Sequence, residues 1–531
     1  MNFDKAKDYL NELLRNPKPT EMLIVYFSSY GDNHNCGIHP ALIPIDQKED
    51  ILLDYGWDLR HEEGLPENIA YCSNGEKKIE YLRFGNDRGI EPLVICRNFH
   101  GIREDYIEIS EEFRLYHNLY YDAKNNTYIK IESDGSETTI IEVSKDQVKI
   151  RVKELKQFLA VKDMFLSIQF DYRIDSNLSL EELNKEQNLE EYKNDLSIWS
   201  IGYGDFNGFS CNGYKSFVRF TGKKLIFPFD KSKKKSSIKD EYIDFIIDVN
   251  DDGEEILFNS NPGLLGNYFG ANPNNPDYLT PVYFDKEVLS KYYNLPSKYS
   301  VEDSYLRCGT LWGLQMDNHH QDMICVWLGD LGRDLPYKEQ LHWRSYNILP
   351  KGKVSNTFVK RQLLAEPTDS EEIDHIFKIK YQKLLSQNND GWLLPLKQND
   401  QHHLASLKLP LTNEQKEFDE LVLSLTKILV DSLNEKFLNS YLDKQDVESL
   451  KGSISKLEFV LDKLNLENFE EHIQFLRTLQ GLRSSSSAHR KGRNYEKISK
   501  TLDIENKDLI TIFTEILSKA TELLDYFLNI K

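Results

Sequence analysis

The 531-residue chain has few cysteines, and their spacing excludes the common cysteine-based scaffolds. There are six, widely scattered: Cys36, Cys72, Cys96, Cys211, Cys308 and Cys325. No two of them form a Cys-x-x-Cys pair, so the sequence indicates neither a zinc knuckle nor a disulfide framework. Cysteines used in this way are typical of a reducing compartment, and we expect a cytoplasmic protein.

The chain also lacks long apolar runs and an excess of positive charge. No stretch reaches the ~18 apolar residues that a bilayer-spanning helix needs, so we expect no membrane partner. The N-terminal residues, Met-Asn-Phe-Asp-Lys-Ala-Lys-Asp, do not form the apolar region of a signal peptide. The formal net charge of -20 argues against a protein that coats nucleic acid without specificity. Any nucleic-acid site must therefore be a local basic patch on an acidic protein.

The length and the residue pattern predict an α+β multidomain protein with β-rich N-terminal and middle regions. We expect an N-terminal domain over 1–175, a middle domain over 176–405 and a helical domain over 410–531. In the first region a helix is expected over 153–165, and apolar and β-branched runs predict strands at 21–28, 78–84, 92–96, 128–132, 138–143 and 148–151. This region has no recognisable activity, and a sensing or regulatory role is expected for it.

Two short segments contain side chains that commonly ligate metals. His34, Cys36 and His39 lie within 32–39, but their spacing fits no zinc pattern and the neighbouring Asn, Asp and Gly favour a loop. In the middle region, a second group follows an expected strand at 308–316 and precedes another at 323–328: Asp317, His319, His320 and Asp322. Asp and Asn there favour a hairpin turn, with a divalent-metal site as the alternative.

The rest of the middle region gives less specific signals. A charged helix is expected over 180–196. Further on, Arg333, His342, Trp343 and Arg344 are suited to recognising a nucleotide, with cations for phosphate and an aromatic face for stacking. A buried structural corner explains the same four residues nearly as well.

The C-terminal region shows four amphipathic helical patterns separated by short links. They cover approximately 412–441, 446–464, 469–482 and 506–528. In the third, Phe469, Ile473, Leu476, Leu479 and Leu482 recur at steps of three and four residues, which places them on one helix face. Four such helices predict an up-and-down bundle.

An arginine and a histidine lie close together at the end of the third helical pattern. Arg483 is followed by Ser484, three more serines, Ala488 and then His489. An arginine is always charged and can contact a phosphate through two nitrogens, whereas a histidine transfers protons near neutral pH. Together they suit RNA cleavage without a metal: a base lets the ribose 2'-hydroxyl attack phosphorus, and the cation stabilises the charge that develops.

The segment 483–489 resembles the motif of HEPN domains, in which an arginine, four to six residues beginning with a polar one, and a histidine lie in a small all-helical bundle. Ser484 is the polar residue here, where family members often carry Asn, Asp or His. The resemblance covers roughly the last 120 residues. It implies a metal-independent ribonuclease without a cofactor, whose two bundles pair so that two motifs form one cleft.

Local charge agrees with an RNA substrate. Between Arg477 and Lys500 there are seven cations against one anion, Glu496, a local charge of +6. Among them, Arg490, Lys491 and Arg493 follow the motif directly and are expected to bind substrate together with Ser484.

Two functions of different class follow. In the first, the chain is an endoribonuclease effector of bacterial phage defence or of a toxin–antitoxin-like system. Arg483 and His489 are then catalytic, and the partners are RNA, a second copy bound through the C-terminal bundle, and a phage-derived or protein trigger. In the second, the bundle is a non-catalytic RNA-binding or dimerisation module, and the function lies in the N-terminal and middle regions.

Overall fold

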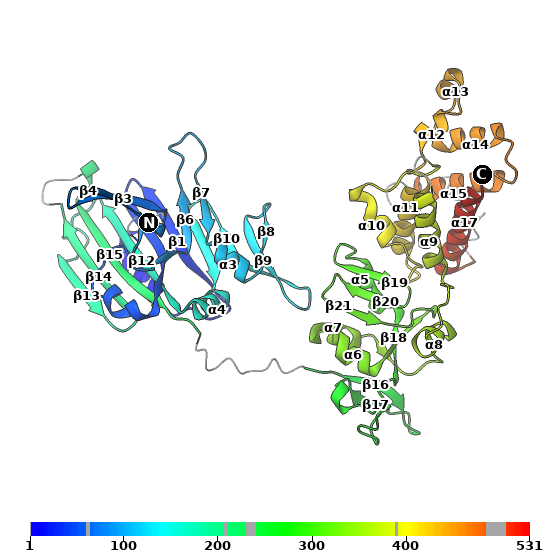
Figure 1. Ribbon diagram of the computed structural model, residues 1–531, viewed down its shortest axis with the longest axis horizontal. Coiled ribbons are helices and arrows are strands. Elements are labelled where there is room, and N and C mark those ends of the chain that lie inside the picture. The colour runs from blue at the N-terminus through cyan, green and yellow to red at the C-terminus, as the bar shows by residue number, and fades with distance from the viewer. Residues whose placement is uncertain are drawn as a thin grey trace. The chain divides into compact units, whose positions relative to one another are not determined.

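The computed structural model describes residues 2–59, 64–206, 211–229, 241–387, 391–484 and 506–530. The chain forms two compact units: Met1–Glu132 with Ser136–Lys239, and Asp240–Lys531 with Ser133–Gly135. The first unit is β-rich, and the second combines small sheets with a C-terminal helical region, so the mixed α/β composition expected from the sequence is confirmed (Figure 1). Within the described ranges, no helix is both long and apolar enough to cross a membrane.

A broad antiparallel sheet organises the first unit. Its strand order is β13-β14-β15-β12-β2-β1-β11-β10-β9-β8, with β5 paired to β2. The strands are β13 Asn188–Lys193, β14 Ser197–Asp205, β15 Ser216–Ile226, β12 Met164–Ser176, β2 His34–Pro44, β1 Met22–Gly31, β11 Gln147–Arg151, β10 Glu137–Val143, β9 Thr127–Ile131, β8 Tyr120–Asp122 and β5 Glu91–Pro92. Two hairpins, β3 Glu67–Ser73 with β4 Glu76–Leu82 and β6 Val94–Arg97 with β7 Tyr106–Ile109, complete its strands in the described ranges.

Both faces of the central strands are buried. In β12, alternate residues from Met164 to Ile174 belong to the main core of this unit, whereas Phe165 belongs to a separate cluster. Because successive side chains of a strand point to opposite faces, the two clusters lie on the two sides of the sheet. The main core also includes residues of the unit's helices α1 Ala6–Leu14, α3 Glu111–Tyr116 and α4 Val152–Lys162, while the short α2 Lys48–Ile51 contributes to the other cluster.

The strands expected in the first 151 residues are all present, but the charged helix expected over 180–196 is wrong. Its second half is β13, whose residues are exposed and pair with β14 at the edge of the sheet. Glu and Lys have good helix propensity, but strand pairing overrides it here. The sheet also continues past residue 175, because β12 pairs along its whole length with β15. The chain therefore divides near residue 240, not at the boundary of 175 that we expected.

The second unit begins with small sheets. They are β16 Asp244–Val249 with β17 Glu255–Asn259; β22 Met323–Trp327, β18 Pro281–Asp285 and β23 Asn347–Ile348; and β19 Tyr299–Glu302, β20 Tyr305–Cys308 and β21 Trp312–Gln315. Four short helices accompany them: α5 Ser290–Tyr293, α6 Leu328–Asp334, α7 Tyr337–Arg344 and α8 Asn356–Gln362. Their core is aromatic and includes the fully buried Tyr292 and Trp343.

The helical region follows. Its described helices are α9 Ile373–Gln387, α10 Gln401–Ala405, α11 Gln415–Leu429, α12 Glu435–Asn439, α13 Lys444–Ser449, α14 Ser453–Lys463, α15 Glu470–Ser484 and α17 Leu509–Asn529. Residues of α9, α11, α14, α15 and α17 share one hydrophobic core (Figure 1). The helix starting near 412 is shorter than expected, and the one expected over 446–464 is broken by Gly452, which has a positive φ.

Helix α9 is the main departure from the expected four-helix arrangement. Phe377, Tyr381 and Leu384 are buried in the same core as α17, so the helical core begins near residue 373 and not 410. Lys380 of α9 also pairs with Asp525 of α17 at 2.5 Å. Packing by α9 accounts for part of the broad apolar surface of α17. Ala520, which lies beside the main apolar face of α17, is also fully buried within the single chain.

We predict that Phe377→Ala destabilises the helical core by roughly 3–5 kcal/mol, because it removes a fully buried aromatic ring and leaves a cavity. Hydrogen exchange of the α9 and α17 amides in the full chain measures this locally. Ile379→Ala on the same helix is the control, since that side chain is 57% exposed. Equal protection in the two variants would show that α9 does not belong to this core.

Candidate functional site

Arg483 lies in the last turn of α15, beside the buried stripe of that helix. Ile473, Leu476, Leu479 and Leu482 are all buried in the helical core, as their three-residue spacing predicts. Arg483 follows the last of them and is only partly exposed. Ser484 ends the helix and donates a hydrogen bond from Oγ to the carbonyl oxygen of Gly481 at 3.0 Å. The arginine of the motif is therefore held by a well-packed helix.

The guanidinium of Arg483 is paired with a carboxylate in the turn that follows α11. Its Nη1 lies 2.8 Å from both Oδ1 and Oδ2 of Asp431. Lys427, one helical turn earlier, brings its Nζ to 3.2 Å from Oδ2 of the same carboxylate. Two cations thus share one anion where α11 and α15 meet. Their side chains are each about one-third exposed, so the group is open to solvent on one side.

The other motif residues fall outside the described part of the chain. His489, Arg490, Lys491 and Arg493 all belong to 485–505, for which the structure gives no placement. Of the residues expected at the site, Arg483 and Ser484 are thus located. The structure adds Asp431 and Lys427, which sequence reasoning missed. Their spacing of four residues on an amphipathic helix signals an ion pair, but nothing in the sequence connects them to Arg483, 52 positions away.

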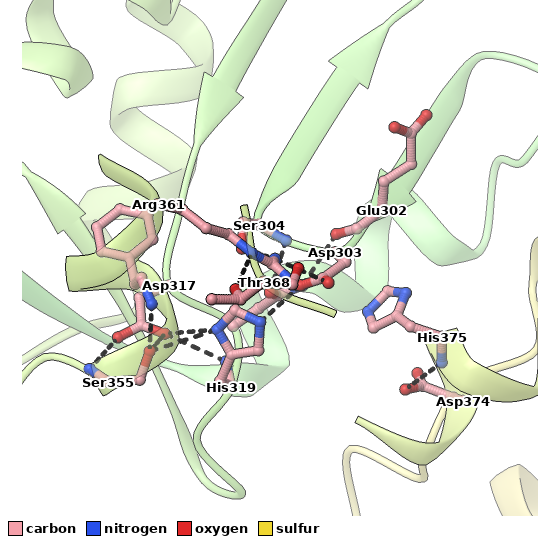
Figure 2. A network of polar contacts seen from close by, with 12 residues as sticks. Glu302, Asp303, Ser304, Asp317, His319, Ser355, Arg361, Thr368, Asp374 and His375 are labelled. Carbon is pink, nitrogen blue, oxygen red and sulfur yellow. Dashed lines mark hydrogen bonds and ion pairs between the residues drawn. The ribbon is translucent and has the colours of Figure 1, made fainter. Parts of the chain in front are cut away.

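A second polar cluster surrounds His319. Figure 2 shows its ring between Asp303, which follows β19, and Asp317, which follows β21. Nε2 lies 2.6 Å from Oδ1 of Asp303, and Nδ1 lies 3.0 Å from Oδ1 of Asp317. The His319 side chain is 4% exposed and that of Asp317 is fully buried. Both ring nitrogens therefore have carboxylate partners, an arrangement that fits a protonated imidazole.

The electrostatics agree with a ring that is charged at neutral pH. Burial alone would lower the pKa of His319, but the hydrogen bonds to Asp303 and Asp317 raise it to about 9. Burial opposes ionisation of the two carboxyls as well, yet the bonds from His319, together with Arg361 at Asp303 and Ser355 at Asp317, hold both pKa values well below their usual range. An imidazolium of this kind has no lone pair to accept a proton near neutral pH, so it is a poor general base.

Ser355 lies next to this ring but has a structural role. Its Oγ donates to Oδ1 of Asp317 at 2.7 Å and accepts from the amide of Phe358 as the N-cap of α8. Its own amide donates to Oδ2 of Asp317 at 2.6 Å. Farther along α8, Arg361 pairs with Oδ2 of Asp303 at 2.8 Å. The serine, histidine and two aspartates therefore attach α8 to the loops after β19 and β21, and do not form a nucleophilic triad.

The two segments considered as metal sites from the sequence do not form such a site among the described residues. No group of three or more His, Cys, Asp or Glu there is arranged to hold a metal ion. The segment 34–39 is not a loop but the start of β2, on which side chains of Cys36 and His39 alternate between faces. The segment 317–322 does connect two strands, but β21 and β22 belong to different sheets and only Asp317 and Cys325 form a bridge.

The residues expected to form a nucleotide-recognition surface make structural contacts instead. Trp343 is fully buried and donates from Nε1 to Oη of Tyr292 at 2.8 Å, so its ring is not available for stacking on a base. Nε2 of His342 hydrogen-bonds the carbonyl oxygen of Val288. Arg333 is occupied by Asp330 and Asp334. These contacts favour the structural interpretation of the segment.

Comparison of the chain with protein-family models, with curated proteins and with solved structures found no match.

We predict that the stability of the His319 cluster declines with rising pH. The folded-state pKa of about 9 lies above the ordinary value of 6.5, so the contribution of His319 is complete below about 6.5 and is lost as pH rises towards 9. Hydrogen exchange of the α8 amides, corrected for the intrinsic effect of pH on exchange, measures the stability of the cluster. His319→Gln should remove this pH dependence and lower the opening free energy by roughly 3–5 kcal/mol, because the fully buried Asp317 loses the cation closest to it and Asp303 keeps only Arg361.

The control for that experiment is His402→Gln, which removes an exposed histidine of α10. It should leave the exchange of α8 unchanged across the same pH range. A wild-type chain whose α8 exchange is equally slow at both ends of the range would contradict the buried imidazolium.

Proposed function

We propose that the chain is a HEPN-like, metal-independent endoribonuclease whose site contains Arg483 and His489. The helical region from α11 to α17 would be its four-helix core, extended by α9. The observation that carries the proposal is the position of Arg483: it lies at the end of a core-packed helix, partly exposed, beside a second cation, and directly before the segment that holds His489.

The chemistry needs two kinds of group. The cation of Arg483 stabilises the negative charge that builds on the phosphate oxygens, and His489 takes the proton of the 2'-hydroxyl or gives one to the leaving 5'-oxygen. A single motif supplies one proton carrier. A second copy, packed through residues 411–531 about a two-fold axis, would supply the other. Ala520 of α17 is buried within one chain and is therefore not part of this dimer contact.

Biologically, we propose that such an activity serves phage defence or a toxin–antitoxin-like system, with a phage-derived or protein trigger. The large β-rich first unit is then available for sensing. RNA is the proposed substrate because cleavage by this route requires the ribose 2'-hydroxyl.

We predict that His489→Ala and Arg483→Ala each lower the RNA cleavage rate of the purified chain by about 10²-fold or more, since they remove a proton carrier and a charge stabiliser. Cleavage of a labelled single-stranded RNA measures the rate. Arg477→Ala is a matched control on the same helix, because Arg477 makes a surface ion pair with Glu458. If His489→Ala cuts RNA as fast as the wild-type chain, this site is not the nuclease centre.

A further prediction concerns metal ions and the product. Cleavage should persist in EDTA and leave 2',3'-cyclic phosphate ends, because the attacking group is the ribose hydroxyl and not a metal-bound water. DNA of the same sequence should remain intact. Mass spectrometry of the products and a parallel assay on DNA measure both outcomes, and activity that EDTA abolishes would contradict the mechanism.

A further inference from the structure

A row of polar side chains extends from Asp431, in the turn just after α11, along that helix towards α10. Ser424 and Lys427 are three residues apart in α11, which places them on one side of the helix. At one end of the row, Asp431 holds Arg483 and Lys427, as described above. With a rise of 1.5 Å per residue, Lys427 and Ser424 are about 4.5 Å apart along the helix axis.

His403 of α10 lies at the other end of the row. Its Nδ1 is 3.0 Å from Oγ of Ser424, which is itself buried. The His403 side chain is partly exposed, and its ring lies beside that of His402, with centroids 4.0 Å apart. Burial is the largest cause of the lowered pKa of His403, His402 is the next, and Lys427 and Arg483 lower it further. Charged and titratable side chains from α10, α11 and α15 therefore lie close enough to influence one another electrostatically.

We propose that Lys427 and His403 extend the Arg483 site into a binding row for the sugar-phosphate backbone of single-stranded RNA. This inference rests on the proposed function and names residues that the motif does not include. Lys427 contacts a phosphate as a point charge, next to the phosphate at Arg483. His403, which Ser424 orients, contributes a hydrogen bond. Asp431 sets the separation of the two cations and keeps them from repelling each other when no phosphate is bound.

A purely structural account of the same residues is available, and it makes a different prediction. Cations at the C-terminus of α11 would stabilise the negative end of the helix dipole, and the Lys427–Asp431 pair is an ordinary i,i+4 ion pair. In that case their removal would slightly lower stability and would not change how the chain binds RNA. Binding measured against salt concentration separates the two accounts, because each phosphate contact with single-stranded RNA changes the slope of log K against log salt by about 0.7.

The experiment uses the full chain and a fluorescent single-stranded RNA with 2'-O-methyl riboses, which this mechanism cannot cleave. We expect Lys427→Gln to weaken binding several-fold and to make the salt slope shallower by about 0.7, and Lys427→Arg to restore both. His403→Ala at neutral pH should weaken binding without changing the slope, because a histidine with a lowered pKa is neutral there. Lys416→Gln, nearer the start of α11 and 83% exposed, is the control and should bind like the wild-type chain.

The proposed RNA-binding row would be refuted if Lys427→Gln and His403→Ala bound RNA as tightly as the Lys416→Gln control. It would also be refuted if the wild-type chain failed to bind this RNA. The outcome is separable from that of the nuclease proposal. If unmodified RNA is cut while the row variants bind normally, only the row is refuted. If the row variants bind poorly while the wild-type chain leaves unmodified RNA intact, only the nuclease is refuted.

Discussion

The buried imidazolium of His319 is the constraint on which the second unit depends, because the segments around it must each supply a partner. Asp303 and Asp317 come from loops that follow two strands of one small sheet, and Ser355 and Arg361 come from the start and the end of α8. A charge taken out of water is costly unless paired and hydrogen-bonded, and a cluster that has lost one member leaves another charge uncompensated. The cluster therefore holds α8 against the two loops, and the loss of one member weakens the contacts of the others.

This attachment positions the helical core. The chain leaves α8, passes Thr368, whose hydroxyl and carbonyl oxygens accept from Arg361, and enters α9 at Ile373. Helix α9 then packs in one core with α17, and Trp392 beyond it stacks on Phe527 with ring centroids 5.5 Å apart. The small sheets and the helices belong to one compact unit, and α9 connects the His319 cluster to the core that also contains α15.

Sequence pattern predicted the parts whose structure depends on local periodicity. The stripe from Ile473 to Leu482 places Arg483 correctly at the end of α15, and apolar and β-branched runs locate the strands of the first 151 residues. Sequence pattern failed to predict elements whose structure depends on contacts between residues far apart in the chain. Strand pairing turns a helix-like sequence into β13, and α9 joins a core whose next long helix, α11, begins only at Gln415. The role of His319 is also set by Asp303, 16 positions away, so a histidine flanked by acids looks like a metal ligand in sequence and is an ion cluster in the structure.

The pairing of Arg483 with Asp431 has two consequences that oppose each other under the proposed function. A carboxylate at 2.8 Å fixes the guanidinium and lowers its repulsion from Lys427, so the cations are arranged before substrate arrives. The same carboxylate cancels one of two positive charges and competes with the phosphate for Nη1. A phosphodiester has two non-bridging oxygens that share one negative charge, and from the solvent side it can bridge both cations without removing Asp431. A polynucleotide, which presents several phosphates in a row, is therefore better suited to this site than a free phosphate, since contacts along α11 add to the one at Arg483.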